Sequence, residues 1–189
     1  MDEAISIAKT GRLEHSEARS KANHDHGFSS QRFREVLGHY PTGVTIITAI
    51  EAGGRPTGMS IGSFASASLD PPLVTFLANR DSSSFQKILR ANSFCVNVLG
   101  VDQQSICRQF AAKGADKFTG ISWRPALSGA PILEGVVAWI DCEIANVFDA
   151  GDHQLVLGRV RALDIATSDS PLVFLKGGYG GFVTGARRP

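Results

Sequence analysis

The stretch VVAWIDCEIANVFDAGDHQLVLGRVRAL, residues 136–163, decides the fold. Two long runs rich in β-branched residues, 136–148 and 154–163, lie on either side of a short turn at 149–152 that contains Asp and Gly. This arrangement predicts two long strands joined as an antiparallel hairpin.

Apolar residues at alternate positions predict one shared face on each strand of this hairpin. In the first strand the shared face carries Ile140, Cys142, Ile144 and Phe148. In the second strand it carries Val156, Val160 and Ala162, while Arg159 and Arg161 point the other way.

Outside the hairpin the chain continues mostly as strand after strand. Further strands are expected at 43–50, 73–77 and 94–99, and the run of small and hydroxyl residues at 57–68 is expected to be a strand as well. Short helices are expected at 30–37 with Ser30 as N-cap, at 84–91, and at 103–112 with Ile106, Phe110 and Ala111 on one side. Because strands and helices do not alternate as in a doubly wound sheet, the order predicts a mainly β protein, an antiparallel barrel with a few peripheral helices.

The composition is that of an ordinary globular protein. Of the 189 residues 43% are hydrophobic and 20% are charged, which is enough apolar material for a sizeable core. The formal net charge of +1 lacks the electrostatic signature of a nucleic-acid or membrane-surface binder. The sequence shows neither a transmembrane run nor the apolar core of a signal peptide. We therefore expect neither nucleic acid nor a membrane as a partner.

The first 27 residues differ from the rest of the chain. They hold nine charged residues and three histidines but almost no large apolar side chains. Such a segment cannot bury enough surface to offset its ordering entropy, so a flexible N-terminal tail over 1–27 and one domain over 28–189 are predicted. His24, Asp25 and His26 could suggest a metal site, but no further ligands lie nearby, and no metal is predicted.

The three cysteines, Cys95, Cys107 and Cys142, are too few and too scattered for a disulfide scaffold or a CxxC site. We interpret them as reduced thiols, which indicates a cytoplasmic protein.

The segment GMSIG at 58–62 has three interpretations. It matches the G-x-S-x-G pattern of serine hydrolases, and Asp141 and His153 follow in the chain order of a triad. That pattern requires a strand, a sharp turn and a helix, whereas Ser60 is followed by more small residues and a Pro-Pro pair. Alternatively, small side chains let a flat ring approach the backbone closely and hydroxyls bond its polar edge, or the strand simply packs under a helix.

Two further polar segments could bind a nucleotide. The cluster 79–84, NRDSSS, ends at a helix start, where free amides and hydroxyls favour anions such as phosphate, although ordinary N-capping explains the same residues. His153 stands at the tip of the predicted hairpin and is the only histidine after Tyr40. The glycine-rich segment 177–182 is not a G-x-G-x-x-G opening a helix, and the chain has no P-loop, so a nucleotide would bind by another route.

Taken together, these segments resemble the flavin reductase-like family, the short-chain NAD(P)H:flavin oxidoreductases that serve two-component monooxygenases. The resemblance covers roughly residues 33–182. It is carried by YPTGVTIIT at 40–48, GMS at 58–60, SFASASLDPPLV at 63–74, FCVNVL at 94–99, GDH at 151–153 and GY at 178–179. Ser60, Gly62 and Ala67 depart from the family's more frequent residues, which are threonine, a larger residue such as asparagine or alanine, and valine.

The resemblance implies an FMN-binding split barrel, an antiparallel Greek-key barrel that forms homodimers. The flavin ring would lie along residues 59–68 and its phosphate near 82–84, while His153 and Tyr179 match positions that contact the nicotinamide nucleotide. The cofactor-binding residues it implies are Thr57, Gly58, Met59, Ser60, Ser63, Ser66, Ala67, Ser68, Ser82, Ser84, Lys87, Lys113, His153 and Tyr179.

The implied activity is hydride transfer from NADH or NADPH to FMN or FAD, which supplies reduced flavin to a partner oxygenase. The protein would act mainly by orienting the two nucleotides, with His153 positioning the nicotinamide and with no obligatory catalytic base. Two alternatives remain: a split-barrel flavoprotein that keeps its flavin and acts on another substrate, and a non-enzymatic flavin- or haem-binding module.

Overall fold

A computed structural model describes residues 27–114 and 116–183. The chain divides into two units, Met1–Leu37 and Gly38–Pro189. The first unit contains helix α1 (Ser30–Leu37), at the predicted bounds. Its N-cap is Ser29 and not Ser30, because the N–H of Arg32 donates to Oγ of Ser29 at 3.1 Å.

Most of the predicted tail and the His24–Asp25–His26 segment lie outside the described residues. The boundary between a tail over 1–27 and a domain over 28–189 therefore stays a prediction. Within the described residues no helix is long and apolar enough to cross a membrane.

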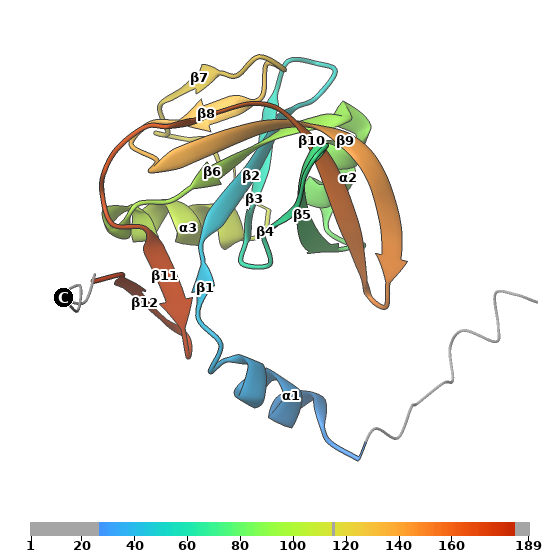
Figure 1. Cartoon of the computed structure of the whole chain (residues 1–189), viewed down its shortest axis with the longest axis vertical. Coiled ribbons are helices and arrows are strands. Elements are labelled where there is room, and N and C mark those ends of the chain that lie inside the picture. The colour runs from blue at the N-terminus through green and yellow to red at the C-terminus, as the bar shows by residue number, and fades with distance from the viewer. Residues whose placement is uncertain (1–26, 115, 184–189) are drawn as a thin grey trace, which may run out of the picture. The chain divides into compact units, whose positions relative to one another are not determined.

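The second unit is built on a seven-stranded antiparallel sheet with the order β3-β2-β6-β9-β10-β5-β4 (Figure 1). Its strands are β2 (Thr45–Ile50), β3 (Pro56–Ile61), β4 (Ala65–Leu69), β5 (Pro72–Asn79), β6 (Ser93–Val98), β9 (Ala138–Ala150) and β10 (His153–Ile165). The long β9–β10 hairpin, with Gly151 and Asp152 in its turn, confirms the predicted hairpin. The mainly β, antiparallel fold class is confirmed.

The small-residue run predicted as one strand forms two strands at opposite ends of the sheet order. The chain leaves β3 after Ile61 and re-enters the sheet as β4 at Ala65. Between them the hydroxyl of Ser63 donates to the carbonyl of Leu77 on β5 and accepts from the N–H of the same residue, each at 3.0 Å. The side chain of Ser63 thus continues the β4–β5 ladder where backbone pairing has ended, and the chain crosses from one edge strand to the other.

A β-bulge changes the predicted buried face of β9. Ile140, Cys142 and Ile144 belong to the core, as expected. The register then shifts by one residue at Ala145, which interrupts the alternation of inward and outward side chains. Phe148, which was predicted to share their face, is therefore exposed.

The second hairpin strand follows its predicted alternation of buried and exposed side chains as far as Val160. Val156 is fully buried and Val160 packs against the same core, while Arg159 and Arg161 are exposed. Arg161 lies at a second bulge and pairs with Glu143 of β9 at 3.2 Å. The bulge shifts the register so that Ala162 lies opposite Asp141, and the prediction that Ala162 shares the face of Val160 was therefore wrong.

Two short helices complete the hydrophobic core. Helix α2 (Ser83–Ala91) buries Phe85 and Ile88, and Phe85 packs edge-on against Phe76 of β5. Helix α3 (Gln104–Ala111) follows a 3-10 turn (Val101–Gln103) and buries Cys107 and Phe110. The predicted apolar side of this helix was partly wrong, since Ala111 is exposed and Cys107 takes the buried position between Ile106 and Phe110.

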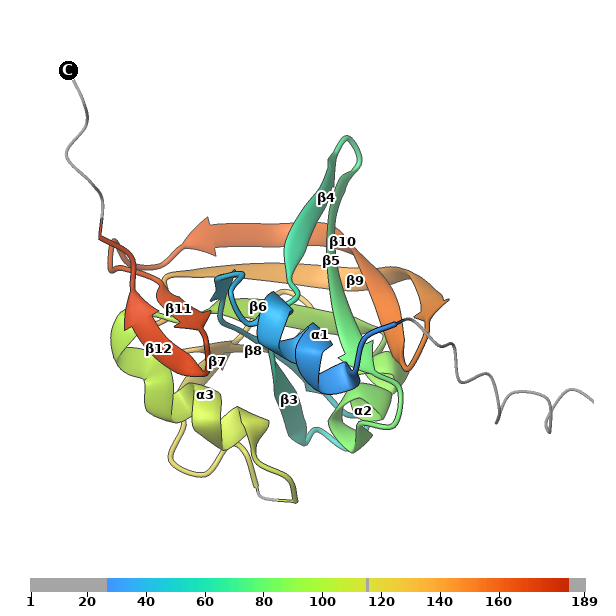
Figure 2. The same ribbon diagram turned by 90° about the horizontal axis from the view of Figure 1, so that it is seen from below.

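Smaller strand pairs flank the main sheet. β1 (Thr42–Gly43), β11 (Leu172–Leu175) and β12 (Gly178–Gly181) form a three-stranded sheet, and β7 (Trp123–Pro125) pairs with β8 (Pro131–Leu133). Seen from below, α2 and α3 lie on either side of β3 (Figure 2). All three cysteines are buried and free, in agreement with the prediction of unpaired thiols.

Candidate functional site

A groove of about 1140 Å³ lies over β3, between the start of α2 and the end of α3 with the loop after it. Strand β3 forms its floor because Gly58 allows close packing: a Cβ there would stand 2.7 Å from Cε1 of Phe110 and 3.0 Å from the carbonyl oxygen of Ile47. Phe110 in turn packs edge-on against Phe118, with ring centroids 5.1 Å apart. The small-residue segment therefore lets a strand, a helix and an aromatic loop meet around one hollow.

More than half of the predicted cofactor-binding residues line this groove, although they come from three separate segments of the chain, β3, the start of α2 and the loop after α3. These residues are Thr57, Gly58, Met59, Ser60, Ser82, Ser84, Lys87 and Lys113.

Six predicted residues do not line the groove, and four of them belong to the segment that follows β3. Ser66 and Ala67 are exposed and Ser68 is half-buried on β4, at the other end of the sheet order. Ser63 precedes β4, and its hydroxyl is engaged with the backbone of Leu77. The prediction of one continuous flavin-contacting strand over 57–68 failed to foresee this separation, because it assumed that the chain runs straight through residues 62–64.

At the start of α2, Ser82 is the N-cap of the helix. Its Oγ accepts from the N–H of Phe85 at 3.3 Å, as ordinary capping requires. The loop before it is shaped by Asn79, whose Oδ1 accepts from the N–H of Asp81 at 2.8 Å. Capping and anion binding are compatible here, since the hydroxyl of Ser82 can still donate its own hydrogen into the groove.

Lys117 joins three walls of the groove and was missed by the sequence reasoning. Its Nζ donates to the carbonyl of Phe110 at 2.9 Å, to Oγ of Ser84 at 3.2 Å and to the carbonyl of Gly58 at 3.3 Å. Partial burial lowers the pKa of Lys117, and the positive charge of Lys87 lowers it further. A cation four residues after Lys113, next to an aromatic residue, was the available signal in the sequence.

The loop that carries Lys117 is held by its own hydrogen bonds. Asp116 accepts from the N–H of Phe118 at 3.0 Å and from the hydroxyl of Thr119 at 2.9 Å. Gln109 donates from α3 to the carbonyl of Lys117 at 3.1 Å. These bonds fix the direction in which the lysine leaves the backbone, and it points toward Ser84.

The two predicted lysines differ in their surroundings. Lys87 pairs with Glu51, with Nζ and Oε1 3.2 Å apart, so part of its charge is already balanced inside the groove. Lys113 lies exposed at the rim. The end of the groove near α2 therefore gathers hydroxyls and ammonium groups, a donor set that suits a phosphate.

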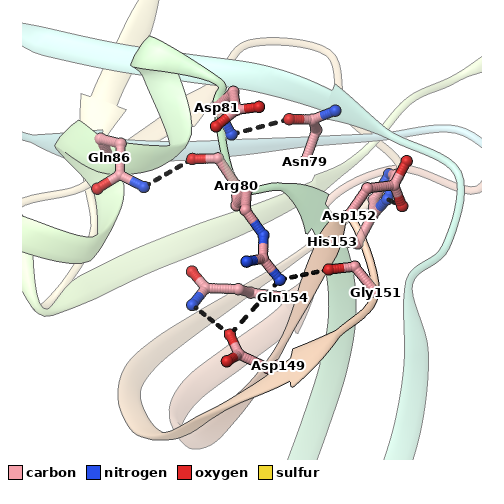
Figure 3. A network of polar contacts seen from close by, with 9 residues as sticks. All are labelled: Asn79, Arg80, Asp81, Gln86, Asp149, Gly151, Asp152, His153 and Gln154. Atoms are coloured by element: carbon pink, nitrogen blue, oxygen red, sulfur yellow. Dashed lines mark hydrogen bonds and ion pairs between the residues drawn. The ribbon is translucent and has the colours of Figure 1, made fainter. Parts of the chain in front are cut away.

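His153 does not line this groove, and it lies next to Asp152 at the turn of the long hairpin (Figure 3). It pairs in register with Asn79, a groove residue on β5. Its Nδ1 lies 2.7 Å from Oδ1 of Asp152, and this hydrogen bond, with the attraction between the two groups, lowers the pKa of Asp152. The predicted positioning histidine is thus at the margin of the groove, on the tip of the long hairpin.

Tyr179 lines a second cavity, of about 150 Å³, which shares Ser60 with the groove. The hydroxyl of Tyr179 lies 3.4 Å from Sγ of Cys107, and this hydrogen bond raises the pKa of Tyr179. Tyr179 therefore lies near the end of β3, next to Ser60, Ile61 and Gly62.

The hydrolase interpretation does not fit this arrangement. Ser60 lies inside β3 and not at a turn into a helix. Asp141 is buried and accepts from the N–H and the Oγ of Ser128, at 2.9 and 2.6 Å, while His153 pairs with Asp152. The three residues that share the chain order of a triad therefore face different partners.

The groove fits a flavin nucleotide in its chemistry. Its floor of small residues and its apolar walls, Met59, Phe110 and Phe118, suit a flat ring. The serines and lysines at its other end suit the phosphate group. This combination suits an aromatic ring that carries a phosphate.

Comparison with known proteins agrees with this description. Residues 37–182 match the family model described as flavin reductase like domain. The chain is 55% identical to a flavin reductase of Pseudomonas putida over 80% of this chain and 89% of that protein. It is 48% identical to the reductase subunit of a flavin-dependent monooxygenase of Rhodococcus jostii, over 80% of this chain and 77% of that protein.

A solved structure extends the comparison to the fold. The NADH:FAD oxidoreductase of Streptomyces globisporus, in complex with NAD and FAD fragments, superposes with a TM-score of 0.78 at 34% identity, over 82% of this chain and 94% of that chain. Fold and site define a split-barrel protein of the kind that handles flavin. The chain belongs to the flavin reductase-like family.

Proposed function

We propose that this chain transfers hydride from NADH or NADPH to FMN or FAD and passes the reduced flavin to a separate oxygenase. The observation that carries the proposal is the groove, where a small-residue strand faces serines and lysines from α2 and the loop after α3. The names of its relatives support the activity, and one of them is the reductase subunit of a flavin-dependent monooxygenase.

The flavin supplies the hydride-accepting ring, and the chain supplies binding and orientation. Gly58 and Ser60 present backbone and small side chains to the ring, and Met59 presents an apolar one. Ser84, Lys87 and Lys113 bind the phosphate. Lys117 keeps these walls at their spacing, because it bonds to Gly58, Ser84 and Phe110 together.

The reduced nicotinamide is proposed to approach from the side of the groove where the β9–β10 hairpin ends. His153 orients it there, beside Asn79. In the second cavity, Tyr179 limits the space around Ser60. Orientation of two nucleotides at hydride-transfer distance is sufficient catalysis for this reaction, and none of these residues needs to act as a general base.

The working form is proposed to be a homodimer in the cytoplasm. Large apolar side chains of the main sheet, Leu69 on β4 and Leu163 and Ile165 on β10, are exposed to solvent, and a second copy would cover such side chains. The free cysteines suit a reducing compartment. Residues 1–27 are proposed to be dispensable for flavin reduction, since the groove lies entirely within Gly38–Pro189.

A steady-state assay with both flavins and both nicotinamide nucleotides tests the function. The expected result is oxidation of NADH or NADPH that depends on added FMN or FAD and saturates with it. Light scattering on the same sample measures the dimer. Stoichiometric flavin that survives dialysis, with no stimulation by added flavin, would instead support a flavoprotein that keeps its flavin.

A further inference from the structure

The tip of the β9–β10 hairpin is fastened to the loop that leads into α2, and Arg80 lies at the centre of this connection (Figure 3). Nη2 of Arg80 donates to the carbonyl of Gly151 and lies 3.8 Å from Oδ1 of Asp149. The backbone N–H of Arg80 donates to the carbonyl of Asp152 at 3.3 Å. One residue therefore holds the turn through both its main chain and its side chain.

Arg80 is itself held from both directions. On the side of α2, Gln86 donates to the carbonyl of Arg80 at 2.8 Å. On the hairpin, Gln154 donates to Oδ1 of Asp149 at 3.1 Å and so fixes the carboxylate that the guanidinium meets. The Nε of Arg80 is buried and has no hydrogen-bond partner among the described residues, so the guanidinium meets the hairpin through Nη2.

The connection bears on His153 because of where the β5–β10 ladder ends. The pairing of His153 with Asn79 is the last rung of that ladder, and the residues beyond it, Gly151 and Asp152, form the exposed turn. A terminal rung opens easily unless something beyond it is tied down. Arg80 supplies that tie, since it bonds to the turn and directly follows Asn79 in the chain.

We propose that Arg80 is a positioning residue for the hydride donor, and that it acts by clamping the hairpin tip so that His153 stays beside the groove. The proposal rests on the proposed function, in which His153 orients the nicotinamide. It assigns a role to a side chain that meets neither the flavin phosphate end of the groove nor its floor.

Kinetics of Arg80→Ala and Arg80→Lys test the proposal, with Arg90→Ala as the matched control on the exposed end of α2. Arg80→Ala is expected to raise the KM for NADH about tenfold, and to change the KM for flavin and kcat less than about twofold. Arg80→Lys keeps the charge near Asp149 but loses the planar fork, so a smaller rise is expected. Arg90→Ala is expected to behave as the wild type.

A double-variant cycle distinguishes positioning through His153 from a general loss of stability. If Arg80 acts through His153, Arg80→Ala added to His153→Ala raises the KM for NADH little further, whereas independent effects multiply to about a hundredfold. Hydrogen exchange gives a second readout, in which residues 149–153 exchange faster in Arg80→Ala while strands β2 and β6 keep their protection.

The outcomes separate the two proposals. A wild-type protein that does not oxidise NADH with added flavin overturns the proposed function itself, before any variant is compared. With an active wild type, an unchanged KM for NADH in Arg80→Ala, or multiplicative effects in the double variant, overturns the role of Arg80 alone. Should Arg80→Ala not fold, Arg80→Lys with the same cycle decides between these results.

Discussion

His153 and Asn79 occupy paired positions on β10 and β5, so the hairpin tip and the wall of the groove share one rung of the sheet. Asn79 lines the groove, and the segment that follows it leads directly into the N-cap of α2. A residue 74 positions later in the chain is thereby brought next to a residue that lines the candidate site. The pairing of His153 with Asn79 therefore connects the long hairpin to the candidate site.

His153→Ala should mainly weaken the use of NADH. Loss of a positioning contact is expected to lower kcat/KM for NADH roughly ten- to hundredfold while flavin binding stays nearly intact. Arg159→Ala, an exposed position farther along β10, is the matched control and should keep wild-type kinetics. Unchanged NADH kinetics in His153→Ala would remove this histidine from the site.

The phosphate end of the groove can be tested with FMN and riboflavin, which differ only in the phosphate. Lys87→Ala should lower the affinity for FMN by about three- to tenfold and leave that for riboflavin almost unchanged. The effect should exceed that of Lys113→Ala, because removal of Lys87 leaves the Glu51 carboxylate unpaired inside the groove. Adding Glu51→Gln to Lys87→Ala should recover part of the loss. Titration of flavin fluorescence measures the affinity of each protein for both flavins, and equal losses for FMN and riboflavin would place the phosphate elsewhere.

Gly58→Ala should destabilise the protein by about 1–3 kcal/mol, because a Cβ would push against the ring of Phe110 and the backbone of Ile47. Gly53 provides the control, since a Cβ there meets nothing within 4 Å. Gly53→Ala should change the free energy of unfolding by less than about 0.5 kcal/mol. Denaturant unfolding measures the free energy of unfolding of both variants. A Gly58→Ala protein as stable as the wild type would show that the groove floor is loosely packed.

The buried thiol of Cys142 should make stability fall at high pH. Burial, together with the charge of Asp141, raises the pKa of Cys142 from 9.0 to about 12. Above pH 9.0 the unfolded chain loses this proton while the folded protein keeps it, so folding is progressively disfavoured as the pH rises. As the pH rises through this range, the unfolding free energy of the wild type should therefore fall relative to that of Cys142→Ala, by up to about 1.4 kcal/mol per pH unit. Parallel stability curves for the two proteins would contradict the raised pKa.

The fold was predictable where residues near in sequence carry the signal. The β9–β10 hairpin follows from alternation and a short turn, and α2 follows from a capping serine before an apolar run. The bulge at Ala145 leaves no mark in the local pattern, since alternation simply stops, and this is why Phe148 was placed on the wrong face.

The site was less predictable, because it depends on contacts between distant segments. That Ser63 bonds to Leu77, and so separates β3 from β4, is decided by a strand that begins nine residues later and returns beside it. The hydrogen bonds of Asp116 and Gln109 decide which lysine reaches across the groove. Lys113 was proposed because of the family resemblance, and no local pattern in the sequence shows that Lys117 is the lysine that bonds to both walls.

Anaerobic mixing of NADH with a large molar excess of flavin over protein tests whether flavin is a dissociating substrate of this chain. The whole flavin pool should lose its oxidised absorbance, at a rate proportional to the protein concentration, because each chain reduces and releases many flavins in turn. Bleaching that stops at one flavin per chain, or that is no faster than in a protein-free control, would contradict a reductase that supplies reduced flavin to a separate oxygenase.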